Sequence, residues 1–248
     1  KTLRLIAQMH KAITIIQFKL EAAAILRHPE FDMNNRLLLH HIDFKRKVFQ
    51  LDGKDYEMRD CLFPTVDPEN PYQLTEEEEE IVLKLHNSFT GSEKLRKHMK
   101  CIFRYGCMYN VCNSNLLFHA SMPMNADGTL KEVEILGSKY KGEALLKRVG
   151  QLIRTAYFAE DDHPEKAFAK DFIWYLWCGK DSPAFDKSKM ATFERYFLTD
   201  KETHKEVKGY YYTLRDREDI CDMILDEFGV EGEHRHIING HVPVKAVK

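Results

Sequence analysis

Apolar residues recur every three to four positions along the first 26 residues of the chain, with polar residues between them. The stripe is formed by Ile6, Met9, Ile13, Ile16 and Leu20. This spacing predicts a helix with one apolar face. We expect the helix to end before His28-Pro29, because the residue that precedes a proline is pushed out of the α region.

A hairpin is predicted over residues 47–58, where two short runs with β character flank Asp52-Gly53. The Asp-Gly pair is typical of a type I′ turn, and it would place Phe49 opposite Tyr56. Residues 61–74 contain three prolines and are expected to form a loop.

Two further segments carry signals for the start of a helix. Thr75 is followed by five glutamates, so its hydroxyl can cap the helix while the acids complement the positive N-terminal end. The glutamate run therefore indicates a first helical turn rather than a metal site. Ser92 begins another predicted helix, which Gly106 ends.

Beyond about residue 105, short apolar runs alternate with helical patterns. Strands are predicted at 115–119 and 235–239, and helices at 142–159, after His163-Pro164 and from Thr213 to Gly229. This alternation favours a layered α/β arrangement. We assign four aromatic residues to its core rather than to a stacking surface, namely Phe172, Trp174, Tyr175 and Trp177. The expected fold is mixed α/β, with a helical domain and its hairpin at 1–105 and an α/β domain at 106–248.

The composition is that of an ordinary globular protein of 248 residues, with 44% apolar and 31% charged residues. The chain has 37 Lys and Arg against 39 Asp and Glu, and this net charge of −2 argues against a general nucleic-acid-binding protein. No apolar run is long enough to span a membrane, and no signal peptide is recognisable, so no membrane association is expected. The six cysteines include no Cys-x-x-Cys pair and are predicted to be reduced, mostly buried thiols of a cytoplasmic protein.

A histidine stands at the end of each of the two strands predicted at 115–119 and 235–239: His119 is the last residue of the first, and His241 follows the second after Gly240. Ligands of open α/β sheets gather beyond the carboxyl ends of the strands, and neutral imidazole is the commonest metal ligand in proteins. The two histidines are therefore candidate metal ligands. Alternatively, both residues are structural histidines held by hydrogen bonds. Their placement alone does not decide between the two roles.

The motifs around both histidines resemble those of calcineurin-like metallophosphatases. Phe118-His119-Ala120-Ser121-Met122-Pro123 is similar to the fourth metal motif of that superfamily, and Gly240-His241-Val242-Pro243 is similar to the last. The segments at 174–183 and 189–197 closely resemble the bacterial class III fructose-1,6-bisphosphatases. The resemblance extends over most of the chain and is strongest from residue 115 to residue 245.

The resemblance implies a helix-rich insertion joined to part of a calcineurin-like metallophosphatase α/β sandwich. It implies a hydrolase that converts fructose 1,6-bisphosphate to fructose 6-phosphate and phosphate in gluconeogenesis, with a two-metal manganese site. By this resemblance His119 and His241 would bind one of the two metals, and no further catalytic residue can be assigned.

The chain also departs from the superfamily pattern. The superfamily's first three motifs supply most of the metal ligands and precede the fourth. Gly-Asp-x-x-Asp-Arg and Gly-Asn-His-Asp/Glu are absent, no Asp-x-His stands ahead of Phe118-His119, and Ala120 stands where the family usually has glycine. The chain begins at Lys1 and ends seven residues after His241. We therefore expect part of a longer enzyme, inactive in isolation, whose remaining residues complete the metal site. A degenerate, non-catalytic homologue is the alternative.

Basic side chains cluster between the two histidine motifs. A bisphosphate needs an anion site away from the metals, and Lys and Arg bind phosphate through charge-assisted hydrogen bonds. The predicted substrate-binding set is Lys180, Ser182, Lys187, Lys189 and Arg195. A solvated loop, whose cations pair with the acidic residues interleaved among them, is the alternative.

An interaction module without catalysis is the second function that the sequence supports. The amphipathic helix over residues 1–26 has a near-heptad stripe, which suits a regulatory or oligomerisation role. Metal content separates the two hypotheses, because the complete enzyme would hold about two manganese ions and a module would hold none. Whether the protein forms a homo-oligomer is left open by the sequence.

Overall fold

The computed structural model describes residues 2–51 and 53–241, which form two compact units. The first unit comprises the residues up to Arg96 together with Ala191–Lys205. The second comprises Lys97–Met190 together with the described residues from Glu206 onward. The domain division at residue 105 stays a prediction for the complete protein.

The first unit contains a long helix and a small antiparallel sheet. Its elements are α1 (Thr2–Arg27), β1 (Ile42–Asp43), β2 (Val48–Leu51), β3 (Lys54–Glu57), α2 (Glu76–Gly91) and α6 (Thr192–Phe197), with 3₁₀ turns at Pro29–Phe31, Asn34–Arg36, Leu39–His41 and Lys201–His204. The strands pair in the order β1-β2-β3, and Phe49 lies opposite Tyr56, which confirms the predicted hairpin register. The helix α3 (Glu93–Tyr105) begins in this unit and ends in the second.

The core of the first unit joins segments that are far apart in the sequence. Phe193 and Phe197 of α6 are buried, and their rings contact Phe49 of β2 and Phe63 of the proline-rich loop. Burial of each such aromatic side chain stabilises the fold by about 1.5–3 kcal/mol. The hairpin is therefore held by a helix that follows it in the chain by more than 130 residues.

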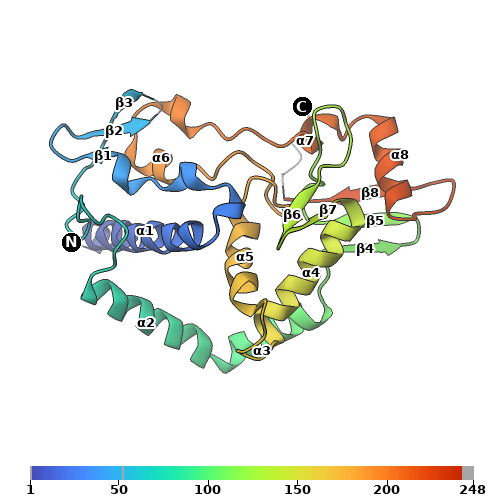
Figure 1. Cartoon of the computed structure of the whole chain (residues 1–248), viewed down its shortest axis with the longest axis horizontal. Helices are drawn as coiled ribbons and strands as arrows, with labels where there is room; N and C mark the ends of the chain where they lie inside the picture. The colour runs from blue at the N-terminus through green and yellow to red at the C-terminus, as the bar shows by residue number, and fades with distance from the viewer. Residues whose placement is uncertain (1, 52, 242–248) are drawn as a thin grey trace. The chain divides into compact units, whose positions relative to one another are not determined.

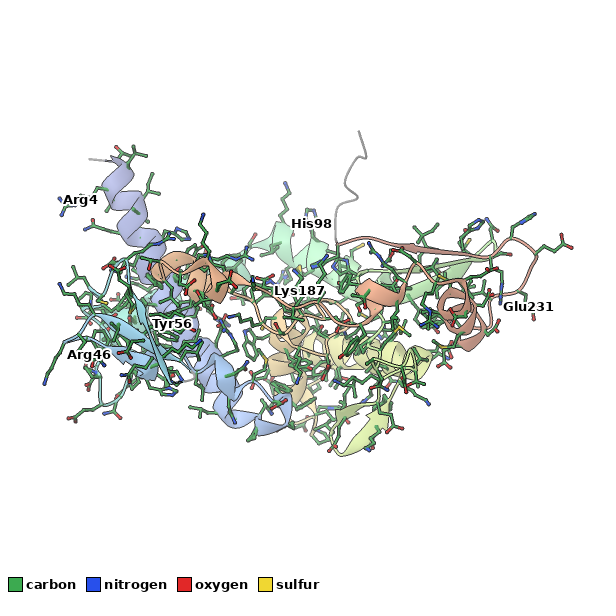
Figure 2. The ribbon with its side chains drawn as sticks, turned by 90° about the horizontal axis from the view of Figure 1, so that it is seen from above. Arg4, Arg46, Tyr56, His98, Lys187 and Glu231 are labelled. Atoms are coloured by element: carbon green, nitrogen blue, oxygen red, sulfur yellow. The ribbon has the colours of Figure 1, made fainter. Side chains whose placement is uncertain are left out.

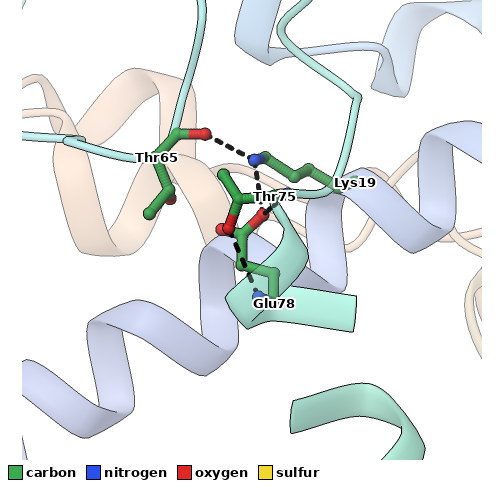
Figure 3. Close-up of polar contacts among 4 residues, drawn as sticks. All are labelled: Lys19, Thr65, Thr75 and Glu78. Atoms are coloured by element: carbon green, nitrogen blue, oxygen red, sulfur yellow. Dashed lines mark hydrogen bonds and ion pairs between the residues drawn. The ribbon is translucent and has the colours of Figure 1, made fainter. Parts of the chain in front are cut away.

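The start of α2 is fixed by the predicted cap and by a buried ion pair (Figure 3). The Thr75 hydroxyl accepts a hydrogen bond from the Glu78 amide at 3.3 Å, and the Thr75 amide donates to the Glu78 carboxylate at 3.0 Å. The ammonium group of Lys19 in α1 donates to Glu78 at 2.7 Å and to the Thr65 carbonyl at 2.6 Å. Lys19 and Glu78 are both buried, so this cluster ties α1, the proline-rich loop and α2 together.

Replacing Lys19 with methionine is expected to lower the free energy of unfolding by about 3–5 kcal/mol, because the Glu78 carboxylate would remain buried without its cation. Urea unfolding followed by circular dichroism measures this change. The exposed pair of Lys84 and Glu80 on α2 supplies the control, and Lys84→Met should cost no more than about 1 kcal/mol. Equal effects of the two substitutions would contradict the structural role of the buried pair.

The same ion pair makes stability depend on pH. Burial raises the pKa of Glu78, but hydrogen bonds from Lys19, Thr65 and Thr75 outweigh burial and leave the pKa below the ordinary 4.5. A carboxylate with a lowered pKa in the folded state stabilises the fold above its unfolded pKa. The difference in unfolding free energy between the parent and Lys19→Met should therefore shrink as the pH falls below 4.5.

In its described part, the second unit combines a mixed sheet with a hairpin, the end of α3 and four further helices (Figure 1). The sheet contains β4 (Tyr109–Cys112), β5 (Asn115–Phe118) and β8 (His236–Asn239), in the order β4-β5-β8. β4 runs antiparallel to β5, whereas β5 and β8 are parallel. The remaining elements are β6 (Val133–Ile135), β7 (Ser138–Tyr140), α4 (Gly142–Phe158), α5 (Lys166–Cys178), α7 (Tyr211–Leu214) and α8 (Glu218–Glu227).

The apolar faces of α4 and α8 point into the core of the second unit. Along α4 the buried residues include Leu145, Val149, Leu152 and Ala156, at the expected spacing. Ile220, Ile224 and Phe228 of the α8 segment pack in a cluster with Leu116 and Phe118 of β5. The sheet is thus covered by a helix whose apolar stripe could be recognised in the sequence.

Three sequence expectations about the second unit are wrong. The helix predicted to begin at Thr213 is divided, because Tyr211 and Tyr212 bury their rings in the short α7 and Arg217 is extended before α8 begins. The cysteines are not mostly buried, since Cys178 is buried and Cys101, Cys107 and Cys112 are exposed. Among the aromatic residues assigned to the core, Trp177 is 51% exposed, although Phe172 and Tyr175 are buried as expected.

The mixed α/β class predicted from the sequence is confirmed by the helices and the three small sheets of the described residues. No helix in this part of the chain combines the length and the apolar character that crossing a membrane requires.

Candidate functional site

The two histidines predicted as metal ligands meet at one edge of the β4-β5-β8 sheet. Because β5 and β8 are parallel and Phe118 lies beside Asn239, both strands end at the same level. The Gly240 amide donates to the His119 carbonyl at 2.9 Å and continues the pairing by one residue. Nδ1 of His241 lies 3.2 Å from Nε2 of His119. The two candidate ligands therefore lie together at one end of the sheet.

Polar contacts fix the loop that follows β5. The Asn239 side-chain amide donates to the Ala120 carbonyl at 2.9 Å, and the Ser121 amide donates to the Pro183 carbonyl at 3.1 Å. The Ser121 hydroxyl donates to the carboxylate of Asp186, and both residues are buried. The loop carrying His119 is therefore attached both to β8 and to the segment after α5.

His241 has a φ of +64°, a left-handed conformation that is uncommon for a residue with a side chain. Asp186, whose carboxylate accepts from the loop after β5, has a φ of +49°. Such conformations cost about 1–3 kcal/mol each and cluster at functional sites. Five other non-glycine residues of the described chain also have a positive φ, so it is the meeting of the two histidines that marks this edge of the sheet as a candidate site.

The two imidazoles are joined by a hydrogen bond between Nδ1 of His241 and Nε2 of His119. Two imidazole nitrogens that bind one metal at about 2.1 Å each lie roughly 3.0–3.4 Å apart at angles between square and tetrahedral. The observed separation of 3.2 Å falls in this range. Binding one ion requires both nitrogen lone pairs to point to it, so the ion would replace the hydrogen bond between the rings. Burial lowers the pKa of His241, and the nearby His119 and Lys187 lower it further, which favours the neutral imidazole that binds metals.

The described residues supply only part of a metal site. Among them, no group of three or more His, Cys, Asp or Glu side chains is arranged to hold a metal ion. Two neutral imidazoles cannot compensate the repulsion between two neighbouring dications. A two-metal centre at this edge would need further ligands, and the roles of His119 and His241 as metal ligands stay predictions.

A pocket of about 480 Å³ opens beside the two histidines. Its lining consists of His119, Leu176, Trp177, Ala184, Phe185, Lys187, Met190, Glu206 and His241. The volume is within the range of small-molecule sites, and the combination of an apolar wall with a few polar groups is typical of them. The Lys187 ammonium lies 3.3 Å from Glu206 and 5.1 Å from the centre of the Phe185 ring. Figure 2 marks Lys187 among the side chains of the chain.

The structure separates the predicted substrate-binding residues. Lys187 lines the pocket of the two histidines. Ser182 is fully buried, and its hydroxyl donates to the Leu176 carbonyl at 2.6 Å. Lys180 is exposed and Lys189 is half-buried, whereas Arg195 belongs to α6 in the first unit. The structure brings only Lys187 to the histidines within the second unit, and the substrate role of all five residues stays a prediction.

Two acidic residues interleaved among these cations have partners outside the predicted set. Asp181 pairs with Lys131 at 2.6 Å, and Glu194 pairs with Arg36 at 2.6 Å and 3.0 Å through a two-pronged contact. Each contact lies within one unit. The first joins two loops, and the second joins α6 to the 3₁₀ turn Asn34–Arg36. These acids therefore have structural partners that sequence proximity did not indicate.

Glu206, Trp177 and Asn239 belong to the site but were not singled out for it in the sequence. Glu206 is 19 residues from Lys187, and no motif connects the two. Trp177 was assigned to the core because it belongs to an aromatic cluster. Asn239 stands directly before the Gly-His motif, and its position at the end of a strand is the one signal that pointed to it.

The buried carboxylate of Asp186 is expected to oppose folding at neutral pH. Burial raises its pKa from 3.8 to about 6, and the hydrogen bond from Ser121 offsets this only in part. The folded state then binds a proton more tightly than the unfolded state, so stability falls as the pH rises from about 4 to about 6. The free energy of unfolding of Asp186→Asn should lack this decline, and the two proteins should diverge by up to roughly 3 kcal/mol. Parallel pH profiles of the two proteins would contradict this account.

The family of the chain follows from comparison with known sequences. The sequence model described as Firmicute fructose-1,6-bisphosphatase matches residues 1–248. The chain belongs to this fructose-1,6-bisphosphatase family, as the resemblance of its motifs indicated.

Curated relatives show the same similarity along the whole chain. The class 3 fructose-1,6-bisphosphatase of Phocaeicola vulgatus is 68% identical over 100% of this chain and 37% of the relative. The class 3 enzymes of Bacteroides fragilis and Porphyromonas gingivalis are 66% and 54% identical over 100% of the chain, covering 37% and 38% of their own lengths. The chain thus spans about 37% of the length of these relatives. No solved structure matches it.

Proposed function

We propose that the chain is part of an enzyme that hydrolyses fructose 1,6-bisphosphate to fructose 6-phosphate and phosphate. The observation that carries this proposal is the meeting of His119 and His241 at the ends of two parallel strands, beside a pocket that contains Lys187. The substrate in this proposal is taken from the names of the relatives, which are fructose-1,6-bisphosphatases. The pocket beside the two histidines is where the phosphate and the sugar would bind.

The proposal includes a manganese centre to which His119 and His241 each contribute one nitrogen. Divalent ions neutralise phosphate oxygens and lower the pKa of bound water. The chain's own contribution is to hold the two imidazoles at a fixed separation. Pairing of β5 with β8 and the Asn239 contact to Ala120 hold the backbone segments that carry the two imidazoles. A mixed set of imidazole and carboxylate ligands, the latter from outside this chain, suits manganese.

Lys187 has a separate task in this proposal. Its ammonium group lies in the pocket of the histidines and is paired with Glu206. A phosphate that reaches the pocket would replace or share this pairing through a charge-assisted hydrogen bond. We therefore assign Lys187 to the phosphate that is not cleaved.

The proposal also includes a role in gluconeogenesis, which the resemblance suggests, and a cytoplasmic location, which the free cysteines suggest.

The second candidate function, an interaction module, is supported by one feature of the first unit. The N-terminal half of α1 exposes large apolar side chains, namely Leu3, Leu5, Ile6 and Met9. Figure 2 marks Arg4 in the same helical segment. Exposed apolar stripes of this kind mark interaction surfaces. Metal analysis of the complete protein separates the functions, because a module without catalysis would bind no manganese.

The isolated chain is expected to be inactive, because two imidazoles do not complete a two-metal centre. The test compares phosphate release from fructose 1,6-bisphosphate by the purified 248-residue chain and by the complete protein, both with added manganese. The proposal is supported if the complete protein releases phosphate and the isolated chain does not. Enzyme-like turnover by the isolated chain would contradict the assignment of missing ligands to the rest of the protein.

A further inference from the structure

Trp177 is an exposed indole in the wall of the histidine pocket. It stands in the last turn of α5, and 51% of its surface is accessible, whereas its neighbour Leu176 is buried. Within the described residues, the indole has no hydrogen bond and no aromatic ring contact. Phe185, the other aromatic residue of this lining, is only 3% exposed. The pocket therefore offers one free aromatic face.

The chemistry of the pocket changes from one part of the lining to another. His119 and His241 supply imidazoles, and Lys187 with Glu206 supplies a charged pair. Trp177 and the adjacent apolar side chains supply a surface without charge. A sugar that carries two phosphates presents the same sequence of features, since two anionic groups flank a ring with apolar C–H faces. Tryptophan suits such a ring, because it is large, rigid and apolar over most of its surface.

We propose that Trp177 is the surface on which the fructose ring of the bisphosphate packs, so that this residue sets the preference for sugar phosphates over small phosphate monoesters. This inference rests on the proposed function and adds a specificity residue to it. Contact with the ring is formed in the bound ground state as well as in the transition state. Its loss should therefore raise KM more than it lowers kcat.

The experiment compares Trp177→Ala, Trp177→Leu and Trp177→Phe in the complete, manganese-loaded protein. For fructose 1,6-bisphosphate, Trp177→Ala should raise KM roughly five- to tenfold with little change in kcat. Trp177→Phe should restore most of the affinity, and Trp177→Leu should restore less, because leucine keeps apolar volume without a flat face. Hydrolysis of ethyl phosphate, which has no ring, should keep its kcat/KM. Calorimetric titration with fructose 6-phosphate should show the same order of affinities.

Tyr210 provides the matched control, since it is 52% exposed and lies outside the lining of the pocket. Tyr210→Ala should leave KM for both substrates unchanged. An unchanged KM for fructose 1,6-bisphosphate in Trp177→Ala would overturn the inference, as would equal losses on ethyl phosphate. If Trp177→Ala changed the oligomeric state or the melting temperature but not KM, the inference would also be overturned. The indole would then belong to a contact with protein and not with the sugar. Absence of activity in the parent protein would overturn the proposed function and this inference together.

Discussion

Substitution of His119 or His241 by alanine in the complete protein is expected to reduce kcat for fructose 1,6-bisphosphate by at least about a hundredfold. Loss of a residue that merely orients a metal ligand typically costs 10–100-fold in affinity or activity, so loss of a ligand should cost more. The fold should survive, because both side chains are exposed at the strand ends. Manganese content should fall together with activity, which elemental analysis of the purified variants measures.

His236 provides the control for this experiment. It lies at the first position of β8, the same strand that leads to His241, and its side chain is exposed. His236→Ala should retain parental activity and manganese content. If His119→Ala or His241→Ala kept parental turnover and metal content, that residue would not be a metal ligand. Loss of activity with unchanged metal content would instead indicate that the histidine acts on the substrate.

Replacing Lys187 with alanine is expected to raise KM for fructose 1,6-bisphosphate by roughly ten- to a hundredfold. A charge-assisted hydrogen bond to phosphate contributes about 1.5–3 kcal/mol, and each 1.4 kcal/mol corresponds to a factor of ten. Ethyl phosphate has no second phosphate, so its kcat/KM should change little. Steady-state kinetics with both substrates measures the difference.

Lys208 is the matched control for Lys187. Its backbone pairs with that of Lys187, but its side chain is exposed and does not line the pocket. Lys208→Ala should leave both kinetic constants unchanged. Equal losses on both substrates in Lys187→Ala would place this lysine at the reacting phosphate, and no loss on either would leave it as the structural partner of Glu206.

The features that could be predicted from the sequence depend on local signals. Thr75 and the glutamates mark the start of α2, because a cap and its partner are only three residues apart. The Asp-Gly pair fixed the expected register of Phe49 and Tyr56. The rule that ligands gather at the carboxyl ends of strands made His119 and His241 candidates, and the resemblance of their motifs assigned both to one metal. This rule applies to strand ends however far apart they are in the sequence, so it could be used for His119 and His241.

The features that were missed depend on contacts between distant segments. Glu206 approaches Lys187 because the chain returns to the second unit after Lys205, and no local pattern announces this return. Trp177 follows a buried leucine in an apolar helix, so periodicity assigned it to the core. Trp177 is exposed because it lines the pocket, and the sequence of α5 does not show on which side of the helix a pocket lies. The ion pair of Arg36 and Glu194 likewise joins residues separated by 158 positions.

The most direct test of the account is manganese-dependent phosphate release by the complete protein, in which the parent is compared with the double variant His119→Ala/His241→Ala. We predict that the metal-stripped parent is inactive and regains activity with manganese, and that the double variant neither binds the full complement of metal nor hydrolyses fructose 1,6-bisphosphate. Parental turnover by the double variant, or by the metal-stripped parent, would contradict the account.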